Sequence, residues 1–219
     1  HASLNSLINR LNALSKSSST NIPKMLLIDN GVHVIKDRDD GYNIVNINFS
    51  ISIIGESREN CIVIGGLKIN GNKEDDVNVS DLTLMHSKRC GVYGFNGASV
   101  HLDKVSVEYS ELSGVSVLYT KRNTMKNCRV SHSEGGGIQV QDGGLMTIDG
   151  NGTTIHHNCT IGYFNFYGLS TGIYSNPGSI HLASSLTIQK ISTNNGGGGN
   201  SGGTGTIKTI TNNNKEAKK

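Results

Sequence analysis

The sequence predicts an all-β solenoid built from parallel strands, and two observations lead to this prediction. The chain holds 28 glycines, two prolines and no tryptophan, a composition that favours strands and tight turns over helices. Three consecutive units lie in register with a 23-residue period and begin at Asp81, Lys104 and Asn127. A fixed period of about 20 to 50 residues is typical of units that bury their apolar faces only by stacking on one another.

The first element is a short helix at the N-terminus, within residues 1–21. Large apolar side chains recur there at spacings of three and four, which places them on one helical face. They are Leu4, Leu7, Ile8, Leu11 and Leu14. A helix this short is marginal alone, so its apolar face must meet a partner. That partner is either the open end of the solenoid, which the helix would cap, or the same helix of a second copy.

Residues 22–185 form the predicted solenoid domain. Between Ile22 and Ile69 short apolar strands alternate with turns at irregular spacing, which indicates one or two early coils with longer loops. From Val77 to Asp149 each unit contains three alternating segments, which predicts a coil of about 23 residues with three walls. In the middle unit, the residues predicted to point into the core are Val105, Val107, Val115, Val117, Asn123 and Met125.

After Asp149 the period lengthens and aromatic residues gather, among them Tyr163, Tyr167 and Tyr174. They either pack a wider final coil or line a surface. Residues 186–219 are expected to hold C-terminal strands, a Gly-rich loop and a polar tail. The two strands are predicted at Leu186–Ile191 and Thr206–Ile210, where they would cover the last rung.

The repeat resembles a known family. Gly-Val-x-Val, a short apolar strand and then Asn-x-x-Val are similar to the right-handed parallel β-helix repeat of pectate-lyase-like proteins, over about residues 22–186. Longer segments such as Arg122–Cys128 and Ile191–Asn200 are similar to uncharacterised β-helix proteins encoded by large DNA viruses of algae. The second resemblance implies virion association and brings no assigned activity, and an extracellular location is the other expectation.

Residues one period apart should stack into columns about 4.8 Å apart. One predicted column holds Asp103, Lys126 and Asp149, and another holds Asp81, Lys104 and Asn127. Alternating charges favour a structural ion ladder in each. The other interpretation is a lyase site, where a lysine base would stand beside carboxylates that bind calcium.

A third predicted column consists of rings, His86, Tyr109 and His132. The two histidines are two rungs apart, about 10 Å, which is too far for one metal ion. Aromatic stacking is therefore the expected role. The adjacent pair His156–His157 is interpreted as a polar turn, and no metal site is predicted.

The wall formed by the Gly-Val-x-Val segments is the candidate binding surface. Its outward side chains are aromatic, hydroxyl and amide groups, which suit sugar stacking, hydrogen bonding or a flat protein contact. The candidate binding residues are Tyr93, Phe95, Ser116, Gln139 and Gln141, with Tyr163 and Tyr167 from the irregular coil. Since this wall carries no acid, base or metal ligand, no catalytic residue is assigned.

Composition argues against several partner classes. A net charge of +3 from dispersed basic residues gives no basic face for nucleic acid. No apolar run reaches the ~20 residues that a membrane span needs. The four cysteines form no Cys-x-x-Cys pair, which argues against zinc, and Cys61 and Cys128 lie in apolar strand contexts where burial is expected.

The sequence therefore favours a non-catalytic structural or adhesive module that self-associates, as a homo-oligomer or larger assembly, and presents a repetitive face to glycans or proteins. The alternative is a polysaccharide lyase or glycoside hydrolase of the pectate-lyase-like class. No cofactor is expected for the first hypothesis, and calcium is expected only for a lyase.

Overall fold

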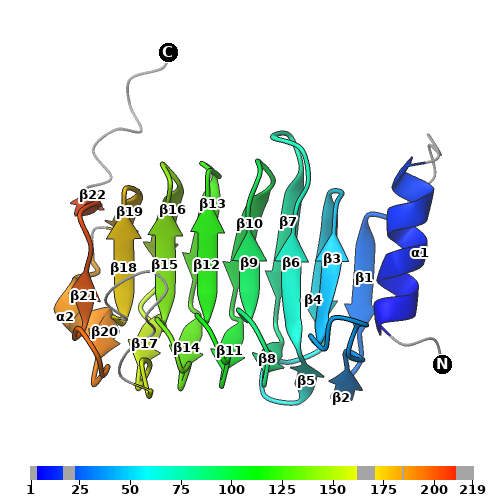
Figure 1. Cartoon of the computed structure of the whole chain (residues 1–219), viewed down its shortest axis with the longest axis horizontal. Helices are drawn as coiled ribbons and strands as arrows, with labels where there is room; N and C mark the ends of the chain where they lie inside the picture. Colours follow the sequence, from blue (N-terminus) through cyan, green and yellow to red (C-terminus); the bar gives the residue numbers. More distant parts are fainter. Residues whose placement is uncertain (1–3, 17–22, 162–170, 184, 211–219) are drawn as a thin grey trace.

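The computed structural model describes residues 4–16, 23–161, 171–183 and 185–210. They form an all-β solenoid of three parallel sheets, with helix α1 (Leu4–Lys16) at its N-terminal end (Figure 1). Each coil contributes one strand to each sheet in turn, so β1, β2 and β3 belong to three different sheets.

The three sheets are named A, B and C in the order in which the chain visits them. Sheet A contains β1 (Met25–Ile28), β4 (Ile51–Gly55), β7 (Asp76–Ser80), β10 (Ser99–Asp103), β13 (Asn123–Lys126), β16 (Leu145–Asp149), β19 (Ser179–Ala183) and β22 (Thr206–Ile210). Sheet B contains β2 (Gly31–Val34), β5 (Cys61–Ile64), β8 (Thr83–Met85), β11 (Ser106–Glu108), β14 (Arg129–Ser131), β17 (Thr154–His156) and β20 (Ser192–Thr193). Sheet C contains β3 (Ile44–Ile47), β6 (Gly66–Ile69), β9 (Val92–Gly94), β12 (Val115–Leu118), β15 (Ile138–Gln141), β18 (Ile173–Asn176) and β21 (Ser201–Gly202).

The strand register shows where the predicted period holds. Val77 pairs with Val100 and Val115 pairs with Ile138, so partners in the central coils are one full period apart in sequence. In sheet A the partners outside this centre are farther apart in sequence, since Ile51 pairs with Val77 and Leu145 pairs with Ser179, whereas in the early coils of the other two sheets Ile62 pairs with Thr83 and Ile44 with Gly66. The expected coil length is thus correct for the central coils, and the coils beside them are irregular in length.

The core is a continuous apolar column inside the three sheets. All six predicted inward residues of the middle unit are buried, and Met125, Val107 and Val117 are fully inaccessible. At about 25 cal/mol per Å² of apolar surface, their burial is the main stabilising contribution. Cys61 and Cys128 are buried free thiols, as expected, and burial raises the pKa of Cys128 to about 11.

Helix α1 packs on the first coil. Ile8 and Leu11 are buried with the core at 0% and 4% exposure. Asn12 also supplies hydrogen bonds to the free edge of β3: its Nδ2 donates to the Asn46 carbonyl at 2.6 Å and its Oδ1 accepts from the Asn48 amide at 3.1 Å. In the structure helix α1 therefore covers the N-terminal end of the solenoid.

The C-terminal part differs from the sequence prediction in one segment. The sequence predicts a strand at Leu186–Ile191, but Ile188–Ile191 forms the one-turn helix α2. The prediction is wrong because Ile188 and Ile191 are three residues apart, which a helical turn places on one face. The strand expected at Thr206–Ile210 is β22, which pairs with β19, so the sheets continue past residue 185. Neither described helix has the length and apolar character needed to cross a bilayer.

Candidate functional site

The corner between sheets A and B is built from residues in the left-handed backbone region. Asp81, Lys104 and Asn127 have φ values of 54°, 52° and 51°, and Gly150 continues the row with φ 80°. Because these residues occupy the same place in successive coils, their side chains form the column that the sequence predicts. The structure brings two of them into an ion pair, with Lys104 Nζ 3.7 Å from Asp81 Oδ1.

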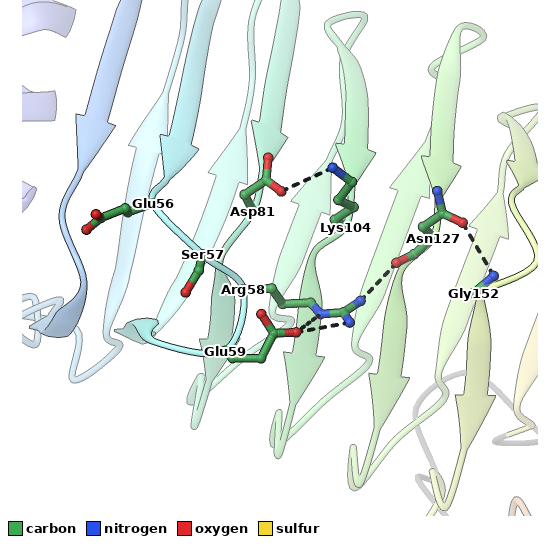
Figure 2. A pocket seen from close by; sticks show the side chains of 8 residues that line it. All are labelled: Glu56, Ser57, Arg58, Glu59, Asp81, Lys104, Asn127 and Gly152. Carbon is green, nitrogen blue, oxygen red and sulfur yellow. Dashed lines mark hydrogen bonds and ion pairs between the residues drawn. The ribbon is translucent and has the colours of Figure 1, made fainter.

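A groove of about 380 Å³ lies over this corner (Figure 2). The loop between β4 and β5 forms one side, and the turns that follow β7, β10, β13 and β16 form the other. The residues that line it are Glu56, Ser57, Arg58, Glu59, Asp81, Lys104, Asn127 and Gly152. Three of these carry carboxylates and two carry cations, so the groove is polar and nearly balanced in charge.

Arg58 crosses the groove and ties its two sides together. Its Nη1 donates to the Asn127 carbonyl at 3.1 Å, and its Nη2 lies 3.2 Å from Glu59 Oε1. Its own carbonyl accepts a hydrogen bond from Thr83 Oγ1 at 2.6 Å. A backbone hydrogen bond and the Arg58 guanidinium lower the pKa of the exposed Glu59 carboxyl. Arg58 is thus held in place by its partners, as a structural cation.

Two further hydrogen bonds fix the groove lining. Glu56 Oε2 accepts from the Asn30 amide at 3.1 Å, and Asn127 Oδ1 accepts from the Gly152 amide at 3.3 Å. Figure 2 shows the lining side chains spread along successive rungs, with Lys104 between Asp81 and Asn127. Hydrogen bonds thus hold Glu56, Arg58 and Asn127 in place along the corner.

The second predicted charge column lies on the outer face of sheet A. Asp103 is in register with Lys126, and Lys126 with Asp149. Among the residues that the structure describes, no ion pair within 4.0 Å joins Lys126 to either carboxylate, and Asp103 Oδ1 is buried without a hydrogen-bond partner. Of the two predicted charge columns, only the one at the corner contains an ion pair among the described residues.

The corner between sheets B and C carries the column of rings. His86 and Tyr109 stack with centroids 5.2 Å apart, and Tyr109 and His132 with centroids 4.9 Å apart. The column continues to His157, whose ring lies 5.4 Å from that of His132 at an interplanar angle of 6°. All four residues have φ between 53° and 57°. The sequence predicts the first three members and places His157 in a polar turn instead.

His156 meets this column edge-on. Its ring is nearly perpendicular to the His157 ring, at 88°, and the two Nδ1 atoms are 2.8 Å apart. Burial, followed by the charges of His157 and His132, lowers the pKa of His156. Beneath this corner, Asn158 is buried and holds the turn through hydrogen bonds to the Ser133 amide and the Val130 and His156 carbonyls.

The wall of sheet C places the described candidate binding residues in one row. Ser116 is in register with Tyr93 and with Gln139, but it is only 3% exposed, so the prediction that it offers a hydroxyl to a ligand is wrong. Tyr93 and Phe95 stack at 5.1 Å, and the Lys68 ammonium lies 5.1 Å from the Phe95 centroid. Gln141 lies beside Leu118 and Asn176. Tyr163 and Tyr167 lie outside the described residues, and Tyr174 is 6% exposed.

The comparison with known families agrees with this geometry. A family model described as a right handed beta helix region matches residues 65–215, which is more than half of the chain. The chain belongs to the right-handed β-helix family. No curated protein and no solved structure matched it.

One polar cluster of this β-helix protein was missed by the sequence analysis. On the outer face of sheet A, His101 Nε2 lies 3.2 Å from Asp76 Oδ1, and His101 Nδ1 lies 2.9 Å from Thr124 Oγ1. Arg122 also pairs with Asp76, at 3.0 Å, and neutralises its charge. The 23-residue offset between His101 and Thr124 could have predicted this contact, since the same offset identifies the other columns.

Proposed function

We propose that this β-helix protein is a non-catalytic module that binds glycan chains in the groove at the corner between sheets A and B. One observation carries the proposal. The groove presents carboxylate, ammonium and amide groups along consecutive rungs, and each cation already has a carboxylate partner. Such a lining offers many hydrogen-bonding groups to a ligand.

The chemistry of the lining suits neutral sugars. Ring hydroxyls both donate and accept hydrogen bonds, and the groove offers acceptors at Glu56 and Asp81 beside donors at Lys104 and Asn127. Its volume of about 380 Å³ lies at the lower end of the range for small-molecule sites, about 300 to 1,000 Å³. Because hydrogen bonds hold Glu56, Arg58 and Asn127 in place, binding loses little side-chain entropy at these three residues.

The wall of sheet C supports binding as a second contact surface. Among the described residues, its outward positions on β6, β9, β12, β15 and β18 carry no carboxylate and no imidazole. The Tyr93–Phe95 stack and the amides of Gln139 and Gln141 offer apolar edges and hydrogen-bonding groups without reactive chemistry. A long glycan or a protein partner would find a regular surface there.

Isothermal titration with neutral and acidic oligosaccharides tests the groove. Lys104→Met removes a lining cation at the centre of the groove and is expected to weaken binding of a neutral oligosaccharide about tenfold. Lys126→Met is the matched control, because Lys126 is an exposed lysine on the outer face of sheet A that does not line the groove. Equal affinities for the two variants would contradict the proposal.

A second candidate function uses the same groove. Lys104 stands 3.7 Å from Asp81, in a groove that also holds Glu56 and Glu59, and this is the combination a calcium-dependent polysaccharide lyase needs. The lysine would take the proton next to the uronate carboxyl, and the glycosidic oxygen would leave as a double bond forms. Calcium-dependent appearance of unsaturated product from acidic polysaccharides, lost in Lys104→Met and kept in Lys126→Met, would favour the lyase over the binding module.

We also propose self-association through the outer faces of the first coil. The apolar face of α1 is occupied by the core, so it offers no seam to a second copy. Four apolar side chains of edge strands β1 and β2 are more than half exposed, namely Met25, Leu27, Val32 and Val34. A second copy would present the same rows in a two-fold contact, which fits the adhesive, extracellular or virion-associated role that the sequence suggests. Sedimentation of Leu27→Asp should show a smaller species than that of the wild-type chain, and unchanged sedimentation would contradict this contact.

A further inference from the structure

A second cavity, of about 410 Å³, lies at the same corner as the groove, toward the C-terminal end of the solenoid. One side is the turn between β16 and β17, and the other is the segment between β19 and β20, which contains α2. Both segments connect a strand of sheet A to a strand of sheet B. The residues that line the second cavity are Asn151, Thr153, Thr154, Ser185, Leu186, Lys190 and Ile191.

The groove and the second cavity share one turn. Gly152 lines the groove beyond Asn127 (Figure 2), and its neighbours Asn151 and Thr153 line the second cavity. The turns that follow β7, β10, β13, β16 and β19 stand on successive rungs, so together they extend over about 19 Å at the inter-strand spacing of a sheet. A ligand that contacts both the groove and the second cavity must therefore be a chain of sugars.

The two cavities differ in charge. In the groove each cation has a carboxylate partner, as Lys104 has Asp81 at 3.7 Å. Among the described residues that line the second cavity, Lys190 carries a charge and none carries a carboxylate. In the same part of the chain, no carboxylate lies within 4.0 Å of the Lys190 ammonium. The second cavity is therefore positively charged, whereas the groove is nearly balanced.

Hydrogen bonds hold the Lys190 ammonium at the second cavity. Its Nζ donates to the Ser185 carbonyl at 3.2 Å, and Ser185 Oγ donates to Asn151 Oδ1 at 3.1 Å, which joins the two sides. An ammonium has three donors, so a bond to one carbonyl leaves donors for the oxygens of an anion. Leu186 and Ile191 are buried in the core and supply the apolar part of the lining.

We infer that the groove and the second cavity form one extended site for a linear oligosaccharide that carries an anionic group, a carboxylate or a sulfate ester, at the end beside Lys190. This inference rests on the proposed binding of glycans in the groove. The neutral part of the chain occupies the groove, passes Gly152, which has no side chain, and places its anionic end in the second cavity. The Lys190 ammonium then donates to the anionic oxygens, and the amide and hydroxyl groups of Asn151 and Thr154 offer further hydrogen bonds to the sugar.

Calorimetric titration of the full chain tests the extended site. The probes are cello-oligosaccharides and N-acetylchito-oligosaccharides of two to six residues, each unmodified, with one terminal carboxylate, or with one terminal sulfate ester. We expect an acidic hexasaccharide to bind the wild-type chain about fivefold tighter than the neutral hexasaccharide of the same series. Lys190→Met should remove this difference, and Lys104→Met should weaken both hexasaccharides.

Lys208→Met is the matched control for Lys190→Met. Lys208 is an exposed lysine of β22, at the same end of the solenoid, and it lines neither the groove nor the second cavity. Its replacement removes the same charge, so it should keep the preference for the acidic hexasaccharide. Because Lys190 and Lys208 are both exposed, both variants should fold, which circular dichroism verifies.

The outcomes distinguish this inference from the proposed function. Equal affinities of the wild-type chain for acidic and neutral hexasaccharides would overturn the inference and leave glycan binding in the groove standing, as would an acidic preference that persists in Lys190→Met. An acidic preference that is lost in Lys190→Met while Lys104→Met weakens no probe would contradict both the extended site and the proposed groove. Binding of no probe would also contradict both. A preference that is lost in Lys190→Met, kept in Lys208→Met and larger for hexasaccharides than for disaccharides supports the extended site.

Discussion

The two corners that flank sheet B both hold residues in the left-handed backbone region, but their side chains differ. At the corner between sheets A and B the left-handed positions hold Asp81, Lys104 and Asn127, and at the corner between sheets B and C they hold His86, Tyr109 and His132. The first set is charged or amidic and leaves a groove of about 380 Å³. The second set is cyclic, and its rings stack on one another at 4.9 to 5.2 Å.

The difference shows that backbone geometry alone does not decide whether a corner is open or filled. A left-handed backbone costs about 1 to 2 kcal/mol for most non-glycine residues and less for Asp and Asn, so the cost is larger for the ring column than for the column that contains Asp81 and Asn127. The ring column recovers it by stacking. The polar column gains less, from one exposed ion pair, and it leaves an open groove.

The largest expected effect compares one asparagine from each corner. Asn158→Ala removes hydrogen bonds to Ser133, Val130 and His156 from a buried position, and we expect a loss of about 2 to 4 kcal/mol. Asn127→Ala removes the half-buried acceptor of the Gly152 amide, and we expect about 0.5 to 1.5 kcal/mol. Urea unfolding measures both losses. A larger loss of stability for Asn127→Ala than for Asn158→Ala would contradict the prediction that the ring corner contributes more to stability.

The next effect concerns the column side chains themselves. Tyr109→Ala breaks two ring stacks, each worth about 0.5 to 1.5 kcal/mol, for an expected loss of about 1 to 3 kcal/mol. Lys104→Ala breaks one exposed ion pair and should cost less than about 1 kcal/mol. Thermal and urea unfolding of the two variants would show equal losses if stacking contributed nothing.

A third effect depends on pH and is confined to the ring corner. Because burial lowers the pKa of His156 below its ordinary value of 6.5, the unfolded chain binds more protons than the folded chain just below that value. Stability is therefore complete above about pH 6.5 and declines as the pH falls below it. His156→Gln should flatten this decline in melting temperature between pH 7 and pH 5. An unchanged slope in the variant would show that His156 does not couple to folding.

The smallest effect tests the backbone cost directly. Lys104→Gly relieves the left-handed conformation and loses only a weak ion pair, so we expect a gain of about 0.5 kcal/mol after the greater unfolded-state entropy of glycine is included. Tyr109→Gly brings the same backbone relief but loses two stacks, so it should be destabilising. Chemical denaturation of both variants provides the comparison, and a loss in Lys104→Gly would show that the polar corner is not strained.

The central coils could be predicted from sequence because their period and alternation are both regular. Val105, Val107 and Met125 are buried because successive residues of a strand face opposite sides and the unit repeats at a fixed interval. The same interval predicted the ring column as far as His132. It missed His157 and Asn158, which follow His132 and Ser133 at a longer interval because the coil lengthens after Asp149.

The groove could not be predicted, because its parts are distant in sequence and share no period. Arg58 contacts Asn127 across 69 residues, and the loop that carries it belongs to an irregular early coil. The direction in which such a loop leans depends on tertiary contacts such as the hydrogen bond from Thr83 Oγ1 to the Arg58 carbonyl. The 23-residue period predicts that Asp81, Lys104 and Asn127 form a column, but it carries no information on the loop that lies over them.

Asn12 has a consequence for the size of the molecule. By bonding to Asn46 and Asn48, it satisfies the free edge of β3 from a helix that lies outside the repeat. The residues that cover the end of the solenoid are thus separate from those that repeat within it. The central coils all pair with the same 23-residue offset. A duplicated copy of residues 104–126 would add one rung of about 4.8 Å. The length of the solenoid thus depends on how many coils follow the N-terminal helix.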